Sequence, residues 1–503
     1  MQVSRHKELA RWGTLGLLAL GFALRVFTLT AQSLWRDEVD ALRFATALLR
    51  QVLSTFTQVG WNGPLYFFVL RGWIGLTGSS EFALRYFSLL LGVVAVALAF
   101  VLARRLAGTA TAFLCATFFA VSPYFIWYSQ EVKMYTLILA CATLAIYALR
   151  RAICHPERSE GSLPGDAETL RRSAAQNDTR TRLQSVAWWT TFVVATTIAF
   201  YSHILAALLI PVEMILALTW GVGARRRWWI GALASFACLT LPYLPLMLWQ
   251  LPLVFQPAQT GYSYYPFDRM LIVTLNGFAA GISGKLPDFT LWLAGLLILI
   301  GVFLSDAAWR DKAALLAWLL LPPLALYLVS LNRPIFTDRY LIWIGPAFYL
   351  FVALGVIALW RLWKPLGIAA MAAMIAIATT GAYLQAAEPI KSDFRGAVQY
   401  FGAHRAPDDL VIFQIPHVRY TFEYYYHKPY TWVEGPFTNY GMSDAQVDEQ
   451  MRPIVAGRKT VWLVASEMEM WDSKLQVWKW LEAHGRRTEE KVFAQVTLYR
   501  YEF

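Results

Sequence analysis

The sequence predicts a mainly α-helical membrane protein, a polytopic bundle of about 11 spans that ends in a small α/β domain. Of the 503 residues, 57% are hydrophobic and only 15% are charged, and the mean hydropathy of +0.44 is high for a soluble protein. The apolar residues gather in runs of roughly 20, the number that a helix needs to cross the ~30 Å core of a bilayer. From residue 385 onward such runs are missing, which separates this last part from the bundle.

Eleven apolar runs are long enough to be membrane spans. They cover residues 12–30, 82–103, 109–127, 133–150, 186–201, 204–220, 228–249, 289–305, 313–330, 340–360 and 365–384. A further apolar stretch at 64–77 is shorter and contains Arg71 and two glycines. We expect it to form a helix along the membrane interface.

The basic residues predict the orientation, because cytoplasmic loops carry an excess of Lys and Arg. With a cytoplasmic N-terminus, the basic clusters all fall in cytoplasmic connections: Arg104-Arg105, the 151–185 loop, Arg225-Arg226-Arg227, Arg310 with Lys312, and Arg361 with Lys364. Counting 64–77 as a span would move these clusters outside. We therefore expect a multi-pass protein of the cell membrane with a first outer loop at 31–81.

Charge and cysteine content argue against two other classes. The formal net charge of +11 comes from the clusters that set the topology, so no nucleic-acid partner is expected. The four cysteines, Cys115, Cys141, Cys154 and Cys238, show no C-x-x-C spacing, which argues against a zinc ribbon or a disulfide framework. The cytoplasmic loop 152–184 is polar and poor in aromatics, which predicts disorder.

Because the number of spans is odd, residues 385–503 are expected outside the cytoplasm as a small α/β domain. Strand-like runs begin at Leu410 and at Val461. A helical stretch covers residues 471–484, and a last strand-like run covers residues 492–501.

Ionisable residues gather in turns on the predicted outer face, where charge near a membrane usually has a function. These turns are WRDEVD at 35–40, NGPLY at 62–66, YSQEVKMY at 128–135, YSH at 201–203 and RPIFTDRY at 333–340. Carboxylates, a histidine and cations on one side of a bilayer are the groups needed for general base catalysis and for binding a phosphate-bearing substrate.

Together these five motifs resemble glycosyltransferase family 39, a group with the GT-C fold that includes protein O-mannosyltransferases and aminoarabinose transferases. The resemblance covers a transmembrane domain at residues 1–384. It implies an enzyme that takes a sugar, a hexose or a pentose, from a polyprenyl-phosphate carrier on the extracytoplasmic side. The sugar passes with inversion to a hydroxyl of an acceptor, which is a glycan, a lipid or a protein.

The resemblance also implies roles for single residues. Asp37 matches the acidic residue that acts as the base toward the acceptor hydroxyl, and Glu38 would orient Asp37 or hold a metal. The substrate-binding residues implied by the motifs are Asn62, Lys133, Tyr135, Arg339 and Tyr340. Asn62 stands in the place of a Lys or His, so Lys133 and Arg339 would have to supply the positive charge for the lipid phosphate.

Glu131 and His203 are the candidate ligands for a divalent metal ion, and no other cofactor is expected. Each site residue has a purely structural alternative. Asp37 is also a common helix-start residue, Glu131 suits a helix dipole, Arg339 and Lys133 suit the end of a span, and a histidine at the interface is simply solvated.

Two other functions compete with the transferase. A polytopic transporter or lipid flippase would also place ionisable residues in a bundle, although the sequence shows neither related halves nor matching broken spans. A non-catalytic assembly partner that binds through its C-terminal domain is the third alternative.

Overall fold

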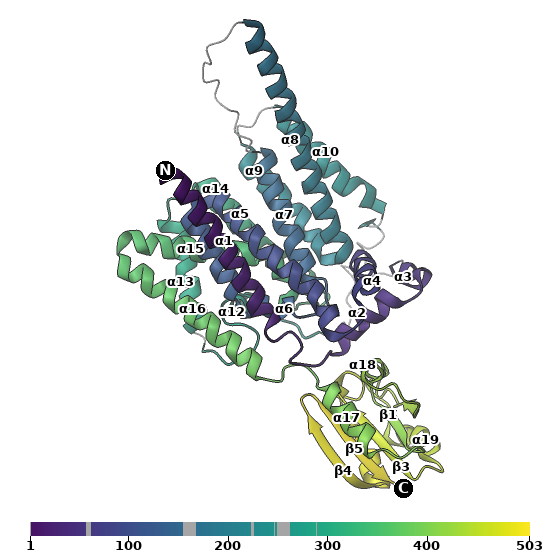
Figure 1. The fold of residues 1–503 in the computed structure, drawn as a ribbon. Coiled ribbons are helices and arrows are strands. Elements are labelled where there is room, and N and C mark those ends of the chain that lie inside the picture. The colour runs from purple at the N-terminus through teal and green to yellow at the C-terminus, as the bar shows by residue number, and fades with distance from the viewer. Residues whose placement is uncertain are drawn as a thin grey trace. The chain divides into compact units, whose positions relative to one another are not determined.

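The computed structural model describes residues 2–56, 62–153, 167–222, 226–245, 247–248, 262–287 and 289–503. These residues form two compact units (Figure 1). The helical unit comprises Met1–Phe27, Leu48–Val69 and Tyr86–Tyr383. The sheet unit comprises Thr28–Ala47, Leu70–Arg85 and Leu384–Phe503.

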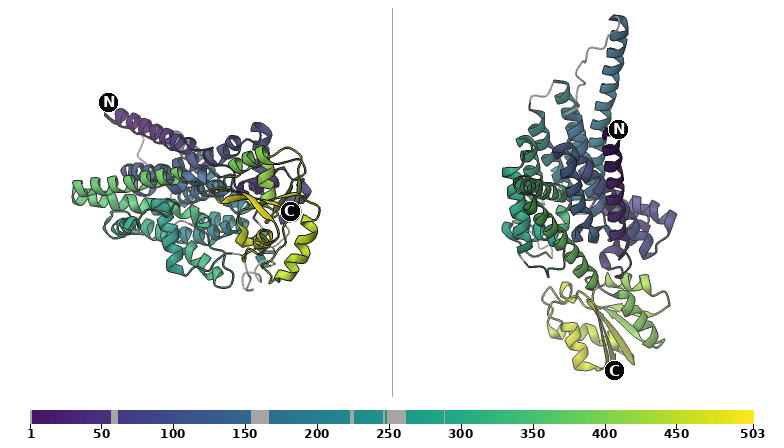
Figure 2. Two further views of the ribbon diagram at one scale, coloured as in Figure 1. Left: turned by 90° about the horizontal axis from the view of Figure 1, so that it is seen from below. Right: turned by 60° about the vertical axis from the view of Figure 1, so that its left-hand side comes forward.

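The helical unit is built from long helices (Figure 2). Neighbouring helices pack against each other, for example α7 with α8 and α13 with α15. Its elements are α1 (Gln2–Val26), α3 (Leu49–Phe56), α6 (Pro123–Ser129), α7 (Tyr135–Ile153), α8 (Ala167–Ser202), η1 (Ile204–Leu208), α9 (Leu209–Gly221), α10 (Arg226–Thr240), η2 (Leu241–Tyr243), α12 (Phe267–Ala280), α13 (Phe289–Leu304), α14 (Trp309–Ser330), η3 (Asp338–Ile344) and α15 (Gly345–Leu362). Helices α4 (Leu65–Thr77), α5 (Glu81–Val121) and α16 (Lys364–Ala387) contribute residues to both units.

The predicted helical membrane fold is confirmed. Among the described residues, 7 helices are long and apolar enough to cross a membrane. One of them, α5, has 41 residues and a non-helical backbone at Gly108 (φ 84°, ψ 176°), so it supplies two of the predicted spans. Each of the eleven predicted segments overlaps a helix or one half of α5. The short segment at 64–77 is also helical, as expected.

The loop at 152–184, which was predicted to be disordered, differs from the expectation in its second half. Helix α8 begins at Ala167 and runs without a break to Ser202, so residues 167–184 are helical. The reason lies in its composition, since Ala, Glu, Leu, Arg and Gln are strong helix formers even when the stretch is polar. Residues 154–166, including Cys154, lie outside the described residues.

The sheet unit contains a mixed five-stranded sheet in the order β2-β1-β3-β5-β4. Strands β1 (Leu410–Phe413), β2 (Thr431–Glu434) and β3 (Thr460–Ala465) are parallel, whereas β5 (Val496–Glu502) pairs antiparallel with β3 and with β4 (Arg486–Phe493). The runs predicted at Leu410 and Val461 are therefore strands. The single strand predicted at 492–501 is wrong, because a tight turn with Gln495 at φ 50° divides it into a hairpin.

Alternate residues of a strand point to opposite faces of the sheet. Both faces of this sheet carry apolar side chains, and helices cover both. Val411 and Phe413 of β1 join the core beneath α17 (Phe394–His404) and α18 (Val418–Tyr425). Leu410 and Ile412 join the core beneath α19 (Asp444–Val455) and α20 (Gln476–His484). Helix α20 thus occupies only the second part of the predicted 471–484 stretch.

Two segments that lie between parts of the helical unit in sequence, Thr28–Ala47 and Leu70–Arg85, belong to the sheet unit, which no pattern in the sequence indicated. Helix α2 (Arg36–Thr46) lies in the first of them and packs against α18. Arg43 of α2 stacks over the ring of Tyr420 of α18, 3.1 Å from its centroid. This contact fixes α2, the helix that carries the acidic pair, to the C-terminal domain.

Candidate functional site

The helical unit brings polar side chains from distant turns into one group, which we call the polar cluster. Its members are Tyr128, Glu131, Lys133, Tyr135, His203, Asp338, Arg339 and Tyr340. They come from the turn between α6 and α7, from the junction of α8 with η1, and from the start of η3. Separate turns of the helical unit therefore converge in the structure.

The turn after α6 is held rigidly. Ser122 caps α6 by accepting a hydrogen bond from the backbone N–H of Phe125, and Pro123 occupies the first helical position. The buried Arg25 of α1 donates to the Ser129 hydroxyl at 3.1 Å, and Gln130 donates back to the carbonyl of Arg25 at 2.8 Å. These bonds anchor the start of the turn that carries Glu131 and Lys133.

The α6 turn meets η3 through one acidic and one basic residue of η3. The Tyr128 hydroxyl donates to Asp338 at 3.4 Å. Burial, and after it the nearby carboxylate of Asp338, raises the pKa of Tyr128 well above its usual value, so the phenol stays protonated. The guanidinium of Arg339 lies 5.7 Å from the ring centroid of Tyr135, within cation–π range.

His203 is a neutral hydrogen-bond donor in this cluster. Its Nδ1 accepts the backbone N–H of Leu205 at 3.1 Å, which leaves the ring proton on Nε2. Burial, followed by the positive charges of Arg339 and Lys133, lowers the pKa of His203 to about 3. Its ring lies 4.8 Å from that of Tyr340, centroid to centroid.

The loop that carries Asn62 reaches the same turn. A Cβ at Gly63 would overlap the carbonyl of Tyr201, so only glycine allows the 62–64 backbone to pass this close to the turn before His203. Tyr262 joins from another loop, with its hydroxyl 3.2 Å from that of Tyr340. The loops that carry Asn62 and Tyr262 thus both lie beside residues of the polar cluster.

The predicted metal ligands do not form a metal site. Among the described residues, no group of three or more His, Cys, Asp or Glu side chains is placed to hold an ion. Glu131 accepts the indole N–H of Trp127 at 3.0 Å. His203 already lies near two cations that lower its pKa, so a further positive charge there would be repelled. These residues do not fit a divalent ion.

In the sheet unit, Glu38 is buried in an ion-paired clamp. Arg85 donates to both carboxylate oxygens of Glu38 at 2.8 and 2.7 Å, and Lys391 donates to one of them at 3.1 Å. Burial alone would raise the pKa of Glu38, but the two cations outweigh it and lower the pKa to about 2. The clamp fixes α2 to the start of α5 and to residue 391.

Further hydrogen bonds complete the clamp. Arg85 donates to the carbonyls of Leu29, Gln32 and Ser33 at 2.9, 2.7 and 3.0 Å. Ser33 donates to the carbonyl of Ser392 at 2.7 Å. Because the fork of a guanidinium can satisfy several acceptors at once, Arg85 organises the whole segment before α2.

Asp37, the neighbour of Glu38, lies in a different environment. It is half-buried in the first turn of α2. Next to it, Arg36 pairs with Glu467 at 3.1 Å. Burial raises the pKa of Glu467, Arg36 opposes this rise, and the negative charges of Asp37, Glu469 and Asp40 add to it.

The structure therefore places the candidate residues in two sets. The polar cluster and Asn62 belong to the helical unit, whereas Asp37 and Glu38 belong to the sheet unit. Sequence reasoning missed Arg85, Lys391 and Glu467. Only Arg85 had a usable signal, an arginine near the start of an apolar span.

The predicted resemblance to glycosyltransferase family 39 is supported by comparisons with known proteins. Residues 62–161 match the family model described as dolichyl-phosphate-mannose-protein mannosyltransferase. No curated protein matches the sequence significantly. The family match spans the Asn62 loop and the α6 turn.

Solved structures match almost the whole chain. ArnT from Cupriavidus metallidurans in the apo state has a TM-score of 0.59 at 13% identity, with 97% of each chain covered. The same protein bound to undecaprenyl phosphate gives 0.57 at 12% identity and the same coverage. The oligosaccharyltransferase AglB from Archaeoglobus fulgidus, in complex with an inhibitory peptide and a dolichol-phosphate, gives 0.53 at 12% identity over 98% of this chain and 74% of that chain. The chain has the fold of these proteins, the GT-C fold.

Proposed function

We propose that this GT-C protein is a membrane glycosyltransferase that moves a sugar from a polyprenyl-phosphate carrier to an acceptor hydroxyl on the extracytoplasmic face, with inversion. The observation that carries the proposal is the polar cluster, in which Lys133, Arg339 and the N–H of a neutral His203 gather from three turns. These side chains suit a phosphate monoanion or diester, because two cations and a neutral N–H donor can all donate hydrogen bonds to phosphate oxygens. The undecaprenyl phosphate and dolichol-phosphate bound by ArnT and AglB support this choice of donor.

In the proposed reaction, the carboxylate of Asp37 takes the proton of the acceptor hydroxyl as its oxygen bonds to the anomeric carbon. The bond between that carbon and the phosphate oxygen breaks, and the electron pair leaves with the polyprenyl phosphate. Lys133 and Arg339 stabilise the charge that develops on this leaving group. Attack opposite to the leaving group inverts the anomeric configuration.

Glu38 takes a positioning role in this proposal. Its two oxygens already accept hydrogen bonds from Arg85 and Lys391, and its low pKa makes it a poor base. The clamp instead holds the first turn of α2, where Asp37 lies.

The decisive experiment replaces Asp37 by Asn, which keeps the size of the side chain and removes its basicity. We expect sugar transfer by membranes of matched expression to fall about 100-fold or more, while binding of the lipid-linked donor persists. Asp40→Asn is the matched control, since Asp40 lies one turn further along α2 in an ion pair with Arg43. Transfer at the control's rate by Asp37→Asn would refute the catalytic role.

The membrane orientation is part of the proposal. The distribution of basic clusters supports a cytoplasmic N-terminus and an extracytoplasmic sheet unit. A reporter that is active only outside the cytoplasm, fused after Phe503, should be active. Activity of a cytoplasm-specific reporter at that position would reverse the orientation.

The transporter alternative gains no support from the comparisons. It predicts movement of an intact lipid-linked sugar across a bilayer without bond cleavage. Purified protein incubated with a radiolabelled lipid-linked sugar and an acceptor extract distinguishes the two, because only a transferase releases polyprenyl phosphate.

A further inference from the structure

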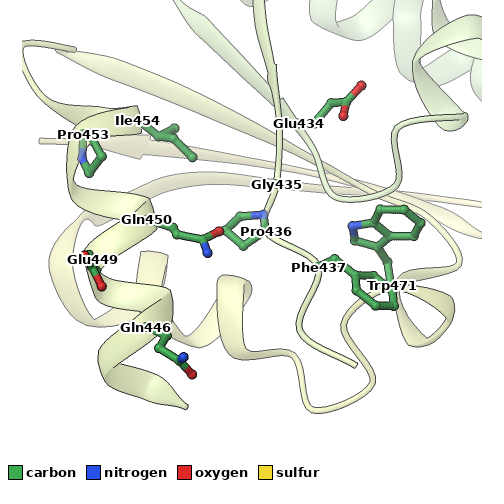
Figure 3. A pocket seen from close by; sticks show the side chains of 10 residues that line it. All are labelled: Glu434, Gly435, Pro436, Phe437, Gln446, Glu449, Gln450, Pro453, Ile454 and Trp471. Atoms are coloured by element: carbon green, nitrogen blue, oxygen red, sulfur yellow. The ribbon is translucent and has the colours of Figure 1, made fainter. Parts of the chain in front are cut away.

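The sheet unit contains a pocket that the proposed reaction does not use. It has a volume of about 790 Å³ and lies beside the end of β2. Figure 3 shows the side chains around it, which come from the segment after β2, from α19 and from the turn before α20. The lining residues are Glu434, Gly435, Pro436, Phe437, Gln446, Glu449, Gln450, Pro453, Ile454 and Trp471.

Helix α19 presents a polar face to this pocket. Gln446, Glu449, Gln450 and Pro453 follow the i, i+3, i+4, i+7 spacing of one helix face. The opposite face of α19, with Val447 and its buried neighbours, packs into the core of the unit. One face of α19 therefore packs in the core, and the other face lines the pocket.

Aromatic rings form the facing wall. The ring of Phe437 contacts that of Trp471 in an edge-to-face arrangement, with 4.5 Å between centroids. Phe437 also contacts Tyr440, with 4.7 Å between ring centroids, and Tyr440 is 91% exposed. An aromatic surface thus continues from the pocket into solvent, which suits a ligand longer than the pocket itself.

The two loops that carry these rings are fastened to each other. Thr438 donates its backbone N–H to the carbonyl of Trp471 at 3.1 Å and its hydroxyl to Asp472 at 2.6 Å. Asn439 donates to the carbonyl of Glu469 at 3.1 Å, and accepts the N–H of Ser473 at 2.7 Å. The wall is therefore preorganised, which lowers the entropic cost of binding.

Hydrogen bonds also hold in place the segment after β2 that lines the pocket. Gln414 donates to the carbonyl of Pro436 at 3.0 Å, and Gly435 donates its N–H to the carbonyl of Phe413 at 2.9 Å. A Cβ at Gly435 would overlap the side chain of Gln414. A larger residue at this position would therefore have to displace the end of the Gln414 side chain.

We propose that this pocket binds an uncharged oligosaccharide and that this oligosaccharide is the acceptor of the transfer. Carboxylates accept hydrogen bonds from hydroxyl groups, and the amides of Gln446 and Gln450 both donate and accept. Aromatic faces attract the C–H faces of a sugar ring through the negative face of the π system. None of the ten lining residues is cationic, which argues against a phosphate or another anion.

The pocket connects to the proposed base within the same unit. Trp471 directly follows the short helix η4 (Met468–Met470), and Glu467 before η4 pairs with Arg36, the neighbour of Asp37. A chain held against Trp471 thus lies on the turn that contacts the first residue of α2. The assignment as acceptor rests on the proposed transferase function, whereas the binding of an oligosaccharide does not.

The test uses the full-length protein in phosphatidylcholine nanodiscs, which avoids competition from glycoside detergents. Cellohexaose, mannohexaose and chitohexaose are the probes, with binding followed by saturation-transfer-difference NMR and by calorimetry. We expect at least one probe to bind in the millimolar range or more tightly. Failure of all three to bind at about 10 mM would overturn the proposal.

Matched variants locate the binding. Gln450→Ala should weaken the affinity about three- to tenfold, the effect of one lost hydrogen bond. Gln399→Ala is the control, because Gln399 is equally exposed on α17, which covers the other face of the sheet. Trp471→Phe keeps a ring in the wall and should weaken binding less than Trp471→Ala. Equal affinities for the Gln450 and Gln399 variants would overturn the proposed site.

Failure of this inference is distinguishable from failure of the proposed function. Asp37→Asn should abolish transfer without changing the affinity for the hexasaccharide. Gln450→Ala should raise the KM for a glycan acceptor and leave kcat nearly unchanged. Transfer that depends on Asp37 but is unaffected by Gln450→Ala would reject the acceptor pocket and leave the transferase intact.

Discussion

Replacing Glu38 by Gln should loosen the segments on either side of the clamp. Glu38 is fully buried, and its pKa lies at about 2 instead of its ordinary value of 4.5. A difference of this size corresponds to about 3 kcal/mol of stability at neutral pH. Removing one partner of a buried ion pair typically costs about 3–5 kcal/mol, which agrees with this value. The amide would leave Arg85 and Lys391 buried without their counter-charge.

Amide hydrogen exchange of the full-length protein measures this loss locally. An opening free energy lower by about 3 kcal/mol makes exchange about a hundredfold faster, and the effect should appear at residues 29–34 and 388–392. Asp40→Asn removes a carboxylate from the same helix, but its ion pair with Arg43 is partly exposed. That control should change exchange less than tenfold.

The same clamp predicts a dependence on pH. Because the pKa of Glu38 is lowered in the folded protein, its contribution is complete above about pH 4.5 and is lost as the pH falls through about 2. Unchanged exchange in Glu38→Gln together with abolished transfer would refute the positioning role and identify Glu38 as the base.

Three further outcomes are expected. Arg339→Ala should raise the KM for the polyprenyl-phosphate donor about ten- to a hundredfold. Arg104→Ala should not raise this KM, although both arginines lie over an aromatic ring at nearly the same distance, 5.7 Å for Arg339 and 5.6 Å for Arg104. Equal effects would contradict the phosphate assignment. Because the pKa of His203 is lowered to about 3, folding should become less favourable by about 2 kcal/mol as the pH falls from 6.5 to 5. His203→Gln should remove this pH dependence of the thermal unfolding temperature. A variant as acid-sensitive as the parent would argue that His203 is not buried in its neutral form. Gly63→Ala should lower the unfolding temperature, because the added Cβ would overlap the carbonyl of Tyr201. Gly72→Ala in α4 is the control, because a Cβ there has open space and should not lower that temperature. Similar unfolding temperatures for the two variants would show that the 62–64 loop does not pack on the turn at Tyr201.

The bundle could be predicted from the sequence because each span is a local pattern. A run of about 20 apolar residues defines a helix without reference to any other part of the chain. The hairpin of β4 and β5 was missed because its turn, at Ala494 and Gln495, contains no Gly, Pro or Asn to mark it. The helical start of α8 was missed because polar composition alone does not distinguish a charged helix from a disordered loop.

The candidate site could be predicted only in part, because its partners lie far apart in sequence. Motifs identified Lys133, His203 and Arg339, and the structure brings these three together. Lys391 pairs with Glu38 across 353 positions of the chain. No local pattern reveals such a pairing, so the clamp could not be anticipated.

The acidic pair Asp37 and Glu38 shows how helix geometry gives two neighbouring residues different surroundings. Consecutive residues of a helix lie about 100° apart, so the side chain of Asp37 leaves the helix in a different direction from that of Glu38. Helix α2 buries Glu38, Val39, Ala41 and Ala45, and this spacing defines one face. Asp37 lies beside that face and stays half-buried. A buried carboxylate must be paired to be tolerated, whereas a base must remain reachable by substrate. Glu38 is therefore suited to a positioning role, and the place of Asp37 on the helix supports our proposal that Asp37 is the base.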